Sequence, residues 1–348
     1  MEMLSALDAT FIYLESEHSP MAIGAVYIID AKDAPEGWSY EAWHSLVKSR
    51  LKLSPVFRQR LVEVPLDLSF PYWVRDPGFD LKAHLPGVTL DQPGGMVELM
   101  QLAADTWGQV LDRERPLWDI TFVSDINSIP GISKGSFALI TRVHHAAVDG
   151  KASTEMMTAL LDVSAEVRIV GGEDDWQPEA LPSTLNVITN SWLRVGQKAR
   201  ELAGFVGKTA LGAAQLQGER WLKRIEPPPR ILSAPPTIFN QPINSPRTFW
   251  GRNFDFERIR AIRKAVPGTT VNDVVLAICA GGLRHYLSDR DELPVKPLVA
   301  MAPISVRGEE EGTGNQVSAM LVSLATDVDD ALNRLVHIRA NTQRSKIH

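Results

Sequence analysis

Short apolar segments with the pattern of strands alternate with longer segments of helical pattern along the first 163 residues. Strands alternate their apolar side chains or carry them in continuous runs, whereas helices repeat them every three or four positions. The alternation of the two patterns predicts a mixed α/β domain. Expected strands cover residues 22–30, 57–65 and 136–145, and expected helices cover 40–53, 94–111 and 151–163.

The pattern changes after residue 164. A polar, proline-bearing segment is followed by a long helical stripe, and residues 184–224 carry seven Lys or Arg against two Glu. Repeated prolines then interrupt regular structure. We therefore expect a first domain over residues 1–164, a linker with a connector helix over 165–246, and a second domain over 247–348.

The second domain repeats the mixture of strands and helices but ends on a helix without a closing strand. It therefore looks unfinished. Expected strands cover residues 247–256, 298–307 and 318–326, and expected helices cover 255–266, 270–287 and 329–346.

Composition excludes several classes of protein. A net charge of -6 argues against a nucleic-acid partner. The single cysteine, Cys279, is expected to be a buried small hydrophobe, and structural zinc patterns are excluded. The acidic start does not resemble a signal peptide, and no apolar stretch approaches the ~20 residues that span a bilayer. We expect a cytoplasmic protein, with attachment to a membrane surface left open.

Two adjacent histidines, His144 and His145, lie in the segment "RVHHAAVDG" between an expected strand and an expected helix. Side chains alternate along a strand, so the two rings are expected to point in opposite directions. That geometry opposes a metal site, and no metal is expected. Two interpretations stay open: a pair of satisfied core histidines, or one neutral imidazole that removes a proton near its usual pKa of ~6.5.

Nearby residues favour the second interpretation. Gly150 leaves room for a close ligand, and Asp149 is placed to orient the turn or to pair with an arginine. Other nucleophile machinery is missing, since the chain has no GxSxG elbow and no phosphate-binding loop. A histidine base that acts directly on a bound substrate is what remains.

The segment "HHAAVDG" resembles the HHxxxDG signature of the CoA-dependent acyltransferase superfamily. Further segments are similar to its bacterial wax ester synthase/acyl-CoA:diacylglycerol acyltransferase branch, and the resemblance extends through nearly the whole chain. These segments are "LSALDATFIYLES", "DPGFDLKAHL", "LDRERPLWD", "APPTIFNQPI", "VNDVVLA" and "GNQVSAMLVSL".

The resemblance assigns roles to individual residues. His145 is implied to be the general base and His144 a structural group, while Asp149 holds the loop through an arginine. Arg58 and Arg60 are the preferred partners of Asp149, and Arg307 is a third candidate. The implied substrate-binding residues are Gly150, Pro116, Leu117, Trp118, Asn272 and Asp273.

Simpler interpretations of two motifs stay open beside these roles. Trp118, in the "PLW" motif, has the character of a buried aromatic that packs at a strand start. Asn272, in the "ND" motif, has the character of a helix N-cap.

The resemblance also implies a fold and an activity. The fold is α/β, with two chloramphenicol-acetyltransferase-like domains around a central tunnel, joined by a helical connector. The activity is transfer of a long-chain acyl group from acyl-CoA to a fatty alcohol, to diacylglycerol, or to both, without an acyl-enzyme. Acyl-CoA is a substrate, and no cofactor is implied. Two alternatives are a silent scaffold on lipid droplets and a condensation-type acyltransferase.

Members of the family continue beyond the length of this chain with further strands and an SNVPG-like motif, which the chain lacks. The chain is therefore expected to lack the last part of its second domain. The basic connector segment in an otherwise acidic chain also suggests a peripheral contact with an anionic membrane or lipid-droplet surface.

Overall fold

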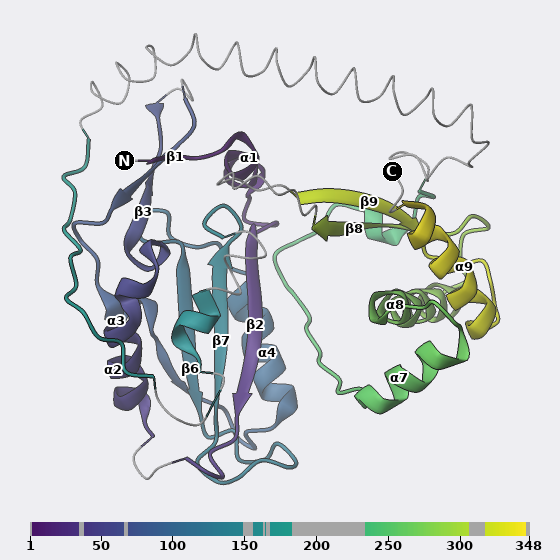
Figure 1. The fold of residues 1–348 in the computed structure, drawn as a ribbon, viewed down its shortest axis with the longest axis horizontal. Helices are drawn as coiled ribbons and strands as arrows, with labels where there is room; N and C mark the ends of the chain where they lie inside the picture. The colour runs from purple at the N-terminus through teal and green to yellow at the C-terminus, as the bar shows by residue number, and fades with distance from the viewer. Residues whose placement is uncertain are drawn as a thin grey trace. The chain divides into compact units, whose positions relative to one another are not determined.

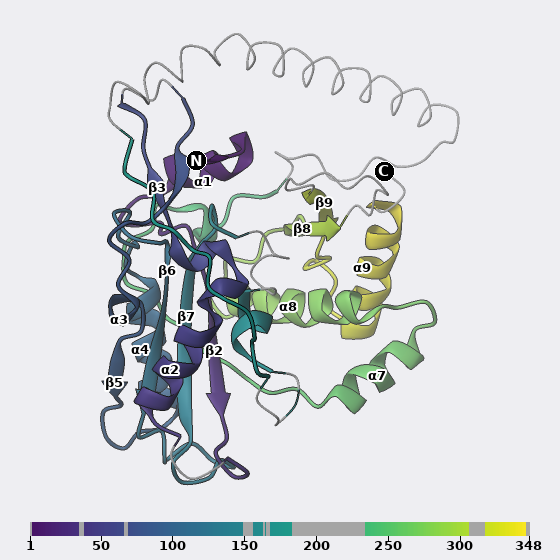
Figure 2. The same ribbon diagram turned by 60° about the vertical axis from the view of Figure 1, so that its left-hand side comes forward.

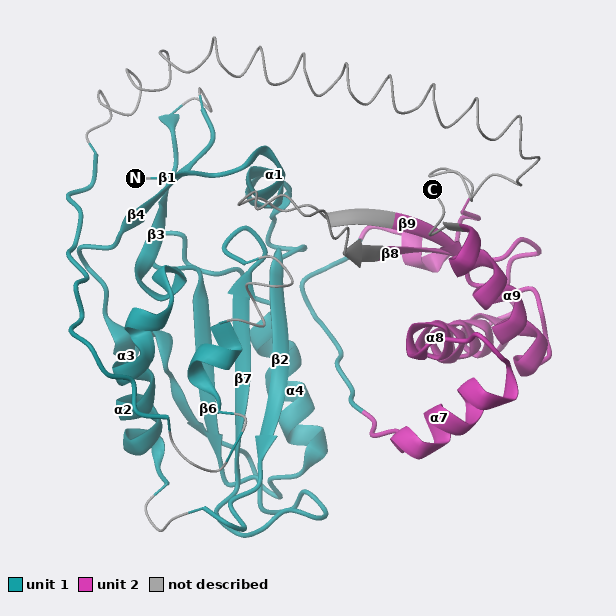
Figure 3. Cartoon of the chain, in the orientation of Figure 1, with its two compact units in different colours: residues 1–198, 243–251 teal, residues 199–242, 252–348 magenta. Residues whose placement is uncertain are grey.

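The computed structural model describes residues 2–34, 38–65, 69–148, 156–162, 164, 168–182, 234–305 and 317–345. The chain divides into two compact units (Figure 3). Unit 1 comprises residues 1–198 and 243–251, and unit 2 comprises residues 199–242 and 252–348. The segment 243–251 thus belongs to unit 1, whereas the helical pattern expected over 184–224 lies outside the described residues.

Unit 1 contains two sheets (Figure 1). The larger sheet has four strands in the order β2 (Ala22–Ile29), β7 (Phe137–His144), β6 (Trp118–Ser124) and β5 (Gly87–Thr89). Its neighbours pair antiparallel except β5 and β6, which are parallel. The smaller sheet is antiparallel in the order β1 (Glu2–Met3), β4 (Tyr72–Arg75) and β3 (Gln59–Val62).

Two helices of unit 1 begin after serine residues that satisfy free backbone amides. Ser5 caps the first helix and Ser39 the second, each by accepting a bond from an amide three residues on. The helices described in unit 1 include α1 (Ala6–Leu14), α2 (Tyr40–Arg50), α3 (Leu81–His84) and α4 (Met96–Trp107). Two 3₁₀ turns, Leu51–Leu53 and Pro55–Arg58, follow α2.

Strand β7 is buried along its whole length because both faces of the sheet are covered. Phe137 and Leu139 join a core cluster that includes side chains of α2, such as Trp43. Ala138 and Ile140 join a second cluster with side chains of α4. A strand covered on both sides needs a continuous apolar run, which is the pattern of this segment. Figure 2 shows α2 and the strands it covers from a second direction.

In its described residues, unit 2 combines a two-stranded antiparallel sheet with three α-helices. The strands are β8 (Val299–Ser305) and β9 (Val317–Ser323), and the helices are α7 (Phe256–Ala265), α8 (Val271–Ser288) and α9 (Ala331–Ser345). A core cluster joins α8 and α9 through Ala280, Leu287 and Ile338. The strands and helices expected within 255–346 are confirmed in this unit.

Two expectations for the second half of the chain are wrong. Residues 247–255 form no strand, because a strand needs a neighbour for its ladder hydrogen bonds and this segment pairs with none in the described part of the chain. Cys279 is exposed rather than buried. The buried stripe of α8 passes through Val274, Ala280 and Leu287, so Cys279 lies off that stripe.

Helix α4 approaches the larger sheet closely at Gly24. A Cβ atom at this position of β2 would lie 2.2 Å from Nε1 of Trp107, whose ring donates a hydrogen bond to the carbonyl of Thr141. We expect Gly24→Ala to lower the free energy of unfolding by about 1–3 kcal/mol, because the indole must move. Gly171→Ala is the control, since its Cβ would meet no atom within 4 Å. Equal urea midpoints for both variants would contradict the close approach.

Candidate active site

The histidine pair lies where β7 ends. His144 is the last residue of the strand, and its amide donates to the carbonyl of Leu117 over 2.9 Å. His145 follows in a turn, with its amide 2.7 Å from the carbonyl oxygen of Met21. The strand end is therefore held from both sides, by the start of β6 and by the residue before β2. Asp149 and Gly150 lie outside the described residues.

His144 is completely buried and has a defined tautomer. Its Nδ1 atom accepts the amide hydrogen of Ala146 over 3.0 Å, so the proton of the neutral ring is on Nε2. Nε2 lies 3.2 Å from Oε1 of Glu15, within ion-pair distance although the two atoms are not aligned as a hydrogen bond. Nδ1 is thus hydrogen-bonded to the protein backbone, and Nε2 lies beside a carboxylate.

Glu15 follows the last residue of α1, and its side chain is only 5% exposed. Its other oxygen accepts a hydrogen bond of 3.0 Å from Nε of Arg113, which also donates to the carbonyl of Ile12. Burial by itself would raise the pKa of Glu15, but His144 and Arg113 outweigh it and lower that pKa. The carboxylate is therefore charged at neutral pH and joins α1, the strand end and the segment before the "PLW" motif.

His145 has a different environment. The residue is half-buried, and its ring stacks on Phe11 with centroids 3.9 Å apart and planes 15° from parallel. Its Nδ1 atom is buried without a hydrogen-bond partner among the described residues. Stacking fixes the plane of the imidazole through the face of the ring and uses neither ring nitrogen as a hydrogen-bond donor or acceptor.

Both histidine rings contact the α1 segment, at Phe11 and at Glu15. The expectation that they point to opposite faces assumed that the strand continues through His145, and it stays a prediction. Side-chain alternation applies within a strand, and β7 ends at His144, so the backbone turns before His145.

Arg142, two residues before His144, connects strand β7 to its neighbours. Its guanidinium pairs with Asp119, the residue opposite on β6, and Nη1 donates to the carbonyls of Thr106 and Gln109 over 2.9 and 2.7 Å. These carbonyls lie at the end of α4, where helix carbonyls lack partners within the helix. Arg142 thus ties α4 to the two central strands close to the histidines.

The "PLW" residues lie in the core of unit 1. Leu117 and Trp118 are buried, and the Trp118 indole donates to the carbonyl of Phe57 over 3.0 Å. The same indole stacks on His84 at 4.7 Å. Pro116 forms an isolated bridge with Arg60. These contacts position the start of β6, and a role in substrate binding stays a prediction.

The "ND" residues lie at the start of α8 in unit 2. Thr270 is the N-cap of this helix, so the expected N-cap role of Asn272 is wrong. Asn272 is exposed in the first turn. Asp273 is buried, completes the capping box with Thr270, and accepts a bond of 2.6 Å from the hydroxyl of Thr342 in α9. Asp273 thereby joins α8 to α9, and contact of either residue with a substrate stays a prediction.

Of the expected arginine partners for Asp149, Arg58 forms a two-pronged ion pair with Asp174, with oxygens 2.7 and 2.8 Å away. Its guanidinium also lies over the ring of Trp176. Arg307 lies outside the described residues, as does Asp149 itself. The arginine that pairs with Asp149 stays a prediction.

Sequence reasoning missed the residues that support the pair. Phe11, Glu15 and Arg113 lie far from it along the chain, and nothing in their local pattern indicates the contact. The only signal was an acidic residue at the end of an apolar segment, together with the charged residues that flank "PLW".

Within the described ranges, no group of three or more His, Cys, Asp or Glu residues is arranged to hold a metal ion. None of the helices described is long and apolar enough to cross a bilayer.

Solved structures define the class of fold. The chain is similar to the first condensation domain of the CDA synthetase, with a TM-score of 0.53 and 13% identity, over 100% of this chain and 75% of that one. It is also similar to the wax ester synthase/diacylglycerol acyltransferase of Marinobacter aquaeolei VT8, with a TM-score of 0.68 and 29% identity, over 100% of this chain and 72% of that one. The expected two-domain α/β acyltransferase fold is confirmed.

Sequence comparison narrows the class to a family. The family model described as the wax ester synthase/diacylglycerol acyltransferase catalytic domain matches residues 4–275, and the chain belongs to this family. A putative diacylglycerol O-acyltransferase of Mycobacterium tuberculosis is 33% identical over 100% of this chain and 73% of its own length. An O-acyltransferase of Acinetobacter baylyi is 32% identical over 99% of this chain and 72% of its own length.

The buried carboxylate of Glu15 predicts a pH-dependent contribution to stability. We expect Glu15→Gln to lower the free energy of unfolding by about 1–3 kcal/mol near neutral pH, because Arg113 and His144 lose a charged partner. The folded-state pKa of Glu15 is below its usual 4.5, so this contribution is present above that value and is lost as the pH falls through the folded pKa. Urea unfolding at pH values from about 7 to about 3 measures this loss. The free energies of unfolding of the variant and of the unsubstituted protein should approach each other as the pH falls.

Glu63→Gln is the matched control, because Glu63 also pairs with Arg113, over 2.7 Å, but is exposed and remote from His144. It is expected to change stability by under ~1 kcal/mol. A Glu15→Gln variant as stable as this control at neutral pH would contradict the role given to the buried contact.

Proposed function

We propose that the protein transfers a long-chain acyl group from acyl-CoA to the hydroxyl group of a fatty alcohol or of diacylglycerol. Membership of the family and the names of relatives in two bacterial genera support this activity. Acyl-CoA is the donor substrate in this proposal, and no separate cofactor takes part. A tunnel between the two units, through which both substrates would reach one centre, stays a prediction.

In this proposal His145 is the general base. Its neutral imidazole removes the proton of the acceptor hydroxyl, and the resulting oxygen nucleophile attacks the thioester carbonyl. The tetrahedral oxyanion collapses, the ester forms, and the thiolate of CoA leaves with the proton that His145 has held. The acyl group passes directly from donor to acceptor, so no acyl-enzyme forms.

The observation that carries the assignment is the difference between the two rings. Both nitrogens of His144 face protein groups, namely the Ala146 amide and Glu15, whereas the half-buried ring of His145 stacks on Phe11 and its Nδ1 has no hydrogen-bond partner among the described residues. A base needs a lone pair that meets the substrate. Because Nδ1 of His145 is buried, we assign the proton transfer to its Nε2 atom.

The remaining site residues have supporting roles in this proposal. Asp149 holds the loop after His145 through an arginine, and Gly150 leaves room for the substrate. Pro116, Leu117 and Trp118 act through the strand they position, and Asn272 and Asp273 act from unit 2. Peripheral docking to a membrane or lipid droplet through the basic residues of 184–224 is part of the same proposal.

Substitution of the two histidines tests the assignment. We expect His145→Ala to lower kcat by about 10²–10⁴-fold with little change in thermal stability, because it removes the base. His144→Ala should retain clearly more activity while losing stability, because it leaves Ala146 and Glu15 without their partner. The measurement is release of CoA from palmitoyl-CoA with hexadecanol or diacylglycerol as acceptor, assayed side by side.

Equal losses of kcat in both variants would contradict a single base. Absence of transfer to either acceptor by the unsubstituted protein would favour the alternative of a silent scaffold on lipid droplets. Transfer only from a carrier-protein thioester would favour a condensation-type reaction.

The docking proposal has a separate test. Reversing the charge of Arg194, Lys198, Arg200 and Lys208 to Glu should reduce binding to anionic liposomes, since each basic residue near such a surface contributes about 1 kcal/mol. Activity on membrane-delivered diacylglycerol should fall, whereas activity on a short soluble alcohol should not. Unchanged liposome binding by the folded variant would leave this segment with a packing role only.

A further inference from the structure

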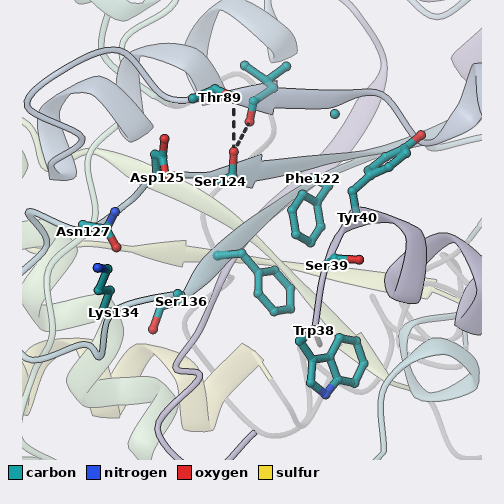
Figure 4. Close-up of a pocket in the computed structure, with 14 residues that line it drawn as sticks. Trp38, Ser39, Tyr40, Thr89, Phe122, Ser124, Asp125, Asn127, Lys134 and Ser136 are labelled. Carbon is teal, nitrogen blue, oxygen red and sulfur yellow. Dashed lines mark hydrogen bonds between the residues drawn. The ribbon is translucent and has the colours of Figure 1, made fainter. Parts of the chain in front are cut away.

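One cavity of unit 1 lies away from the histidine pair. It encloses about 600 Å³ at the end of the larger sheet where β6 ends and β7 begins (Figure 4). Its wall includes Phe137, the first residue of β7, whereas His144 is the last residue of that eight-residue strand. At about 3.3 Å per residue, the two strand ends are roughly 23 Å apart. A small molecule bound in this cavity therefore cannot present the same hydroxyl to His145.

One wall of the cavity is a row of four aromatic rings. Tyr40 contacts Phe122 edge-on, with centroids 6.0 Å apart. Phe122 stacks on Phe137 at 4.7 Å, and Phe137 stacks on Trp38 at 6.1 Å. The Tyr40 hydroxyl donates to the carbonyl of Leu85 over 2.6 Å, which holds the end of the row in place. The row forms a preformed apolar side of the cavity, with Trp38 and Tyr40 half-buried and Phe122 and Phe137 each 6% exposed.

The opposite side of the cavity is polar. Figure 4 shows Asp125, Asn127 and Lys134 together, across from Trp38, Tyr40 and Phe122. None of the three polar side chains makes a hydrogen bond or ion pair with another residue in the described part of the chain. Among the described residues of the lining, Asp125 supplies the only carboxylate and Lys134 the only ammonium, so their charges cancel.

We propose that this cavity binds a neutral single-chain lipid with a hydroxyl-bearing head, of the monoacylglycerol class. The alkyl chain lies along the aromatic row, where its burial is favourable. A hydroxyl group both donates and accepts, so a glycerol head matches Asp125 as acceptor and Asn127 and Lys134 as donors. An anionic head would meet the carboxylate of Asp125, and a cationic head would meet the ammonium of Lys134.

The size and composition of the cavity fit this class of ligand. Small-molecule sites enclose roughly 300–1,000 Å³ and combine an apolar lining with a few polar groups that orient the ligand. Ser124 and Ser136 also line the cavity, but their hydroxyls are engaged, with Thr89 and with Asp30 respectively. Head-group recognition therefore depends on Asp125, Asn127 and Lys134.

Photo-crosslinking tests the site directly. The probe is a 1-monoacylglycerol with a diazirine in its alkyl chain, used below its micelle concentration, and peptide mass spectrometry maps the modified residues. We expect labelling of Trp38, Tyr40 and Val88, because all three line the cavity. Labelling should persist in His145→Ala, so this result is independent of the proposed acyl transfer. Absence of label on these residues would overturn the proposal.

Competition by unlabelled lipids of equal chain length tests the head group. 1-Decanoylglycerol should compete for the cavity better than decanoate or decylphosphocholine. Asp125→Asn and Lys134→Met should each weaken that competition about three- to tenfold, because the first replaces a charged acceptor by a weaker neutral one and the second removes a donor. Asn tolerates the positive φ of 59° at residue 125, so the first variant keeps the backbone. Stronger competition by decanoate or decylphosphocholine would overturn the assignment of a neutral head.

A steric variant completes the test. Val88→Trp on β5 places an indole in the cavity and should reduce its labelling at least about tenfold. Val97→Trp is the matched control, because Val97 is 63% exposed on α4 and does not line the cavity. Circular dichroism checks that both variants are folded. Labelling of Trp38 and Tyr40 that is unchanged by Val88→Trp would show that the lipid binds elsewhere, which overturns the proposal.

Discussion

The turn that carries His145 depends on the buried ring of His144, whose Nε2 lies within ion-pair distance of Glu15 and whose Nδ1 accepts a hydrogen bond from the amide of Ala146. Moving the amide of Ala146 would leave Nδ1 of His144 buried without its donor, at a cost of about 1–3 kcal/mol, and moving Glu15 would remove the carboxylate beside Nε2. Arg113 extends the contact to the segment before β6. Helix α1, the end of β7 and the start of β6 are therefore held at one point, and the backbone after His144 follows from that arrangement.

These contacts give the adjacent side chains of His144 and His145 different chemical environments. The ring of His144 is engaged by its neighbours: its tautomer is fixed by the bond from the Ala146 amide, and the residue has no exposure to solvent. His145, one residue later, lies beyond the strand, and its ring stacks on Phe11 of α1. A general base must be both oriented and accessible to substrate. Stacking orients a ring without occupying its nitrogens, so an aromatic neighbour such as Phe11 suits a general base. A carboxylate neighbour such as Glu15 suits a histidine with a structural role.

Local periodicity predicted most of the secondary structure of the described residues, including the strand that ends at His144 and the helix that begins after Thr270. It failed where an element depends on a distant partner. Residues 247–255 have the composition of a strand but lack a neighbouring strand within the described ranges. Cys279 lies in an apolar segment, yet the packing of α8 leaves it exposed. For the candidate site, the motif identified the two histidines, and the residues that distinguish them were not predictable from it.

The order of residues by itself determined the mixed α/β class, the place of the histidine pair between a strand and a following segment, and membership of an acyltransferase family. These follow from spacing and motif, which are properties of neighbours along the chain. Only the tertiary structure decided that Glu15 and Phe11 approach different histidines, that Arg142 pairs with Asp119, and that four aromatic rings line a cavity at the far end of the sheet. Each of these contacts joins residues distant in sequence, and pairing of this kind depends on how the strands and helices pack.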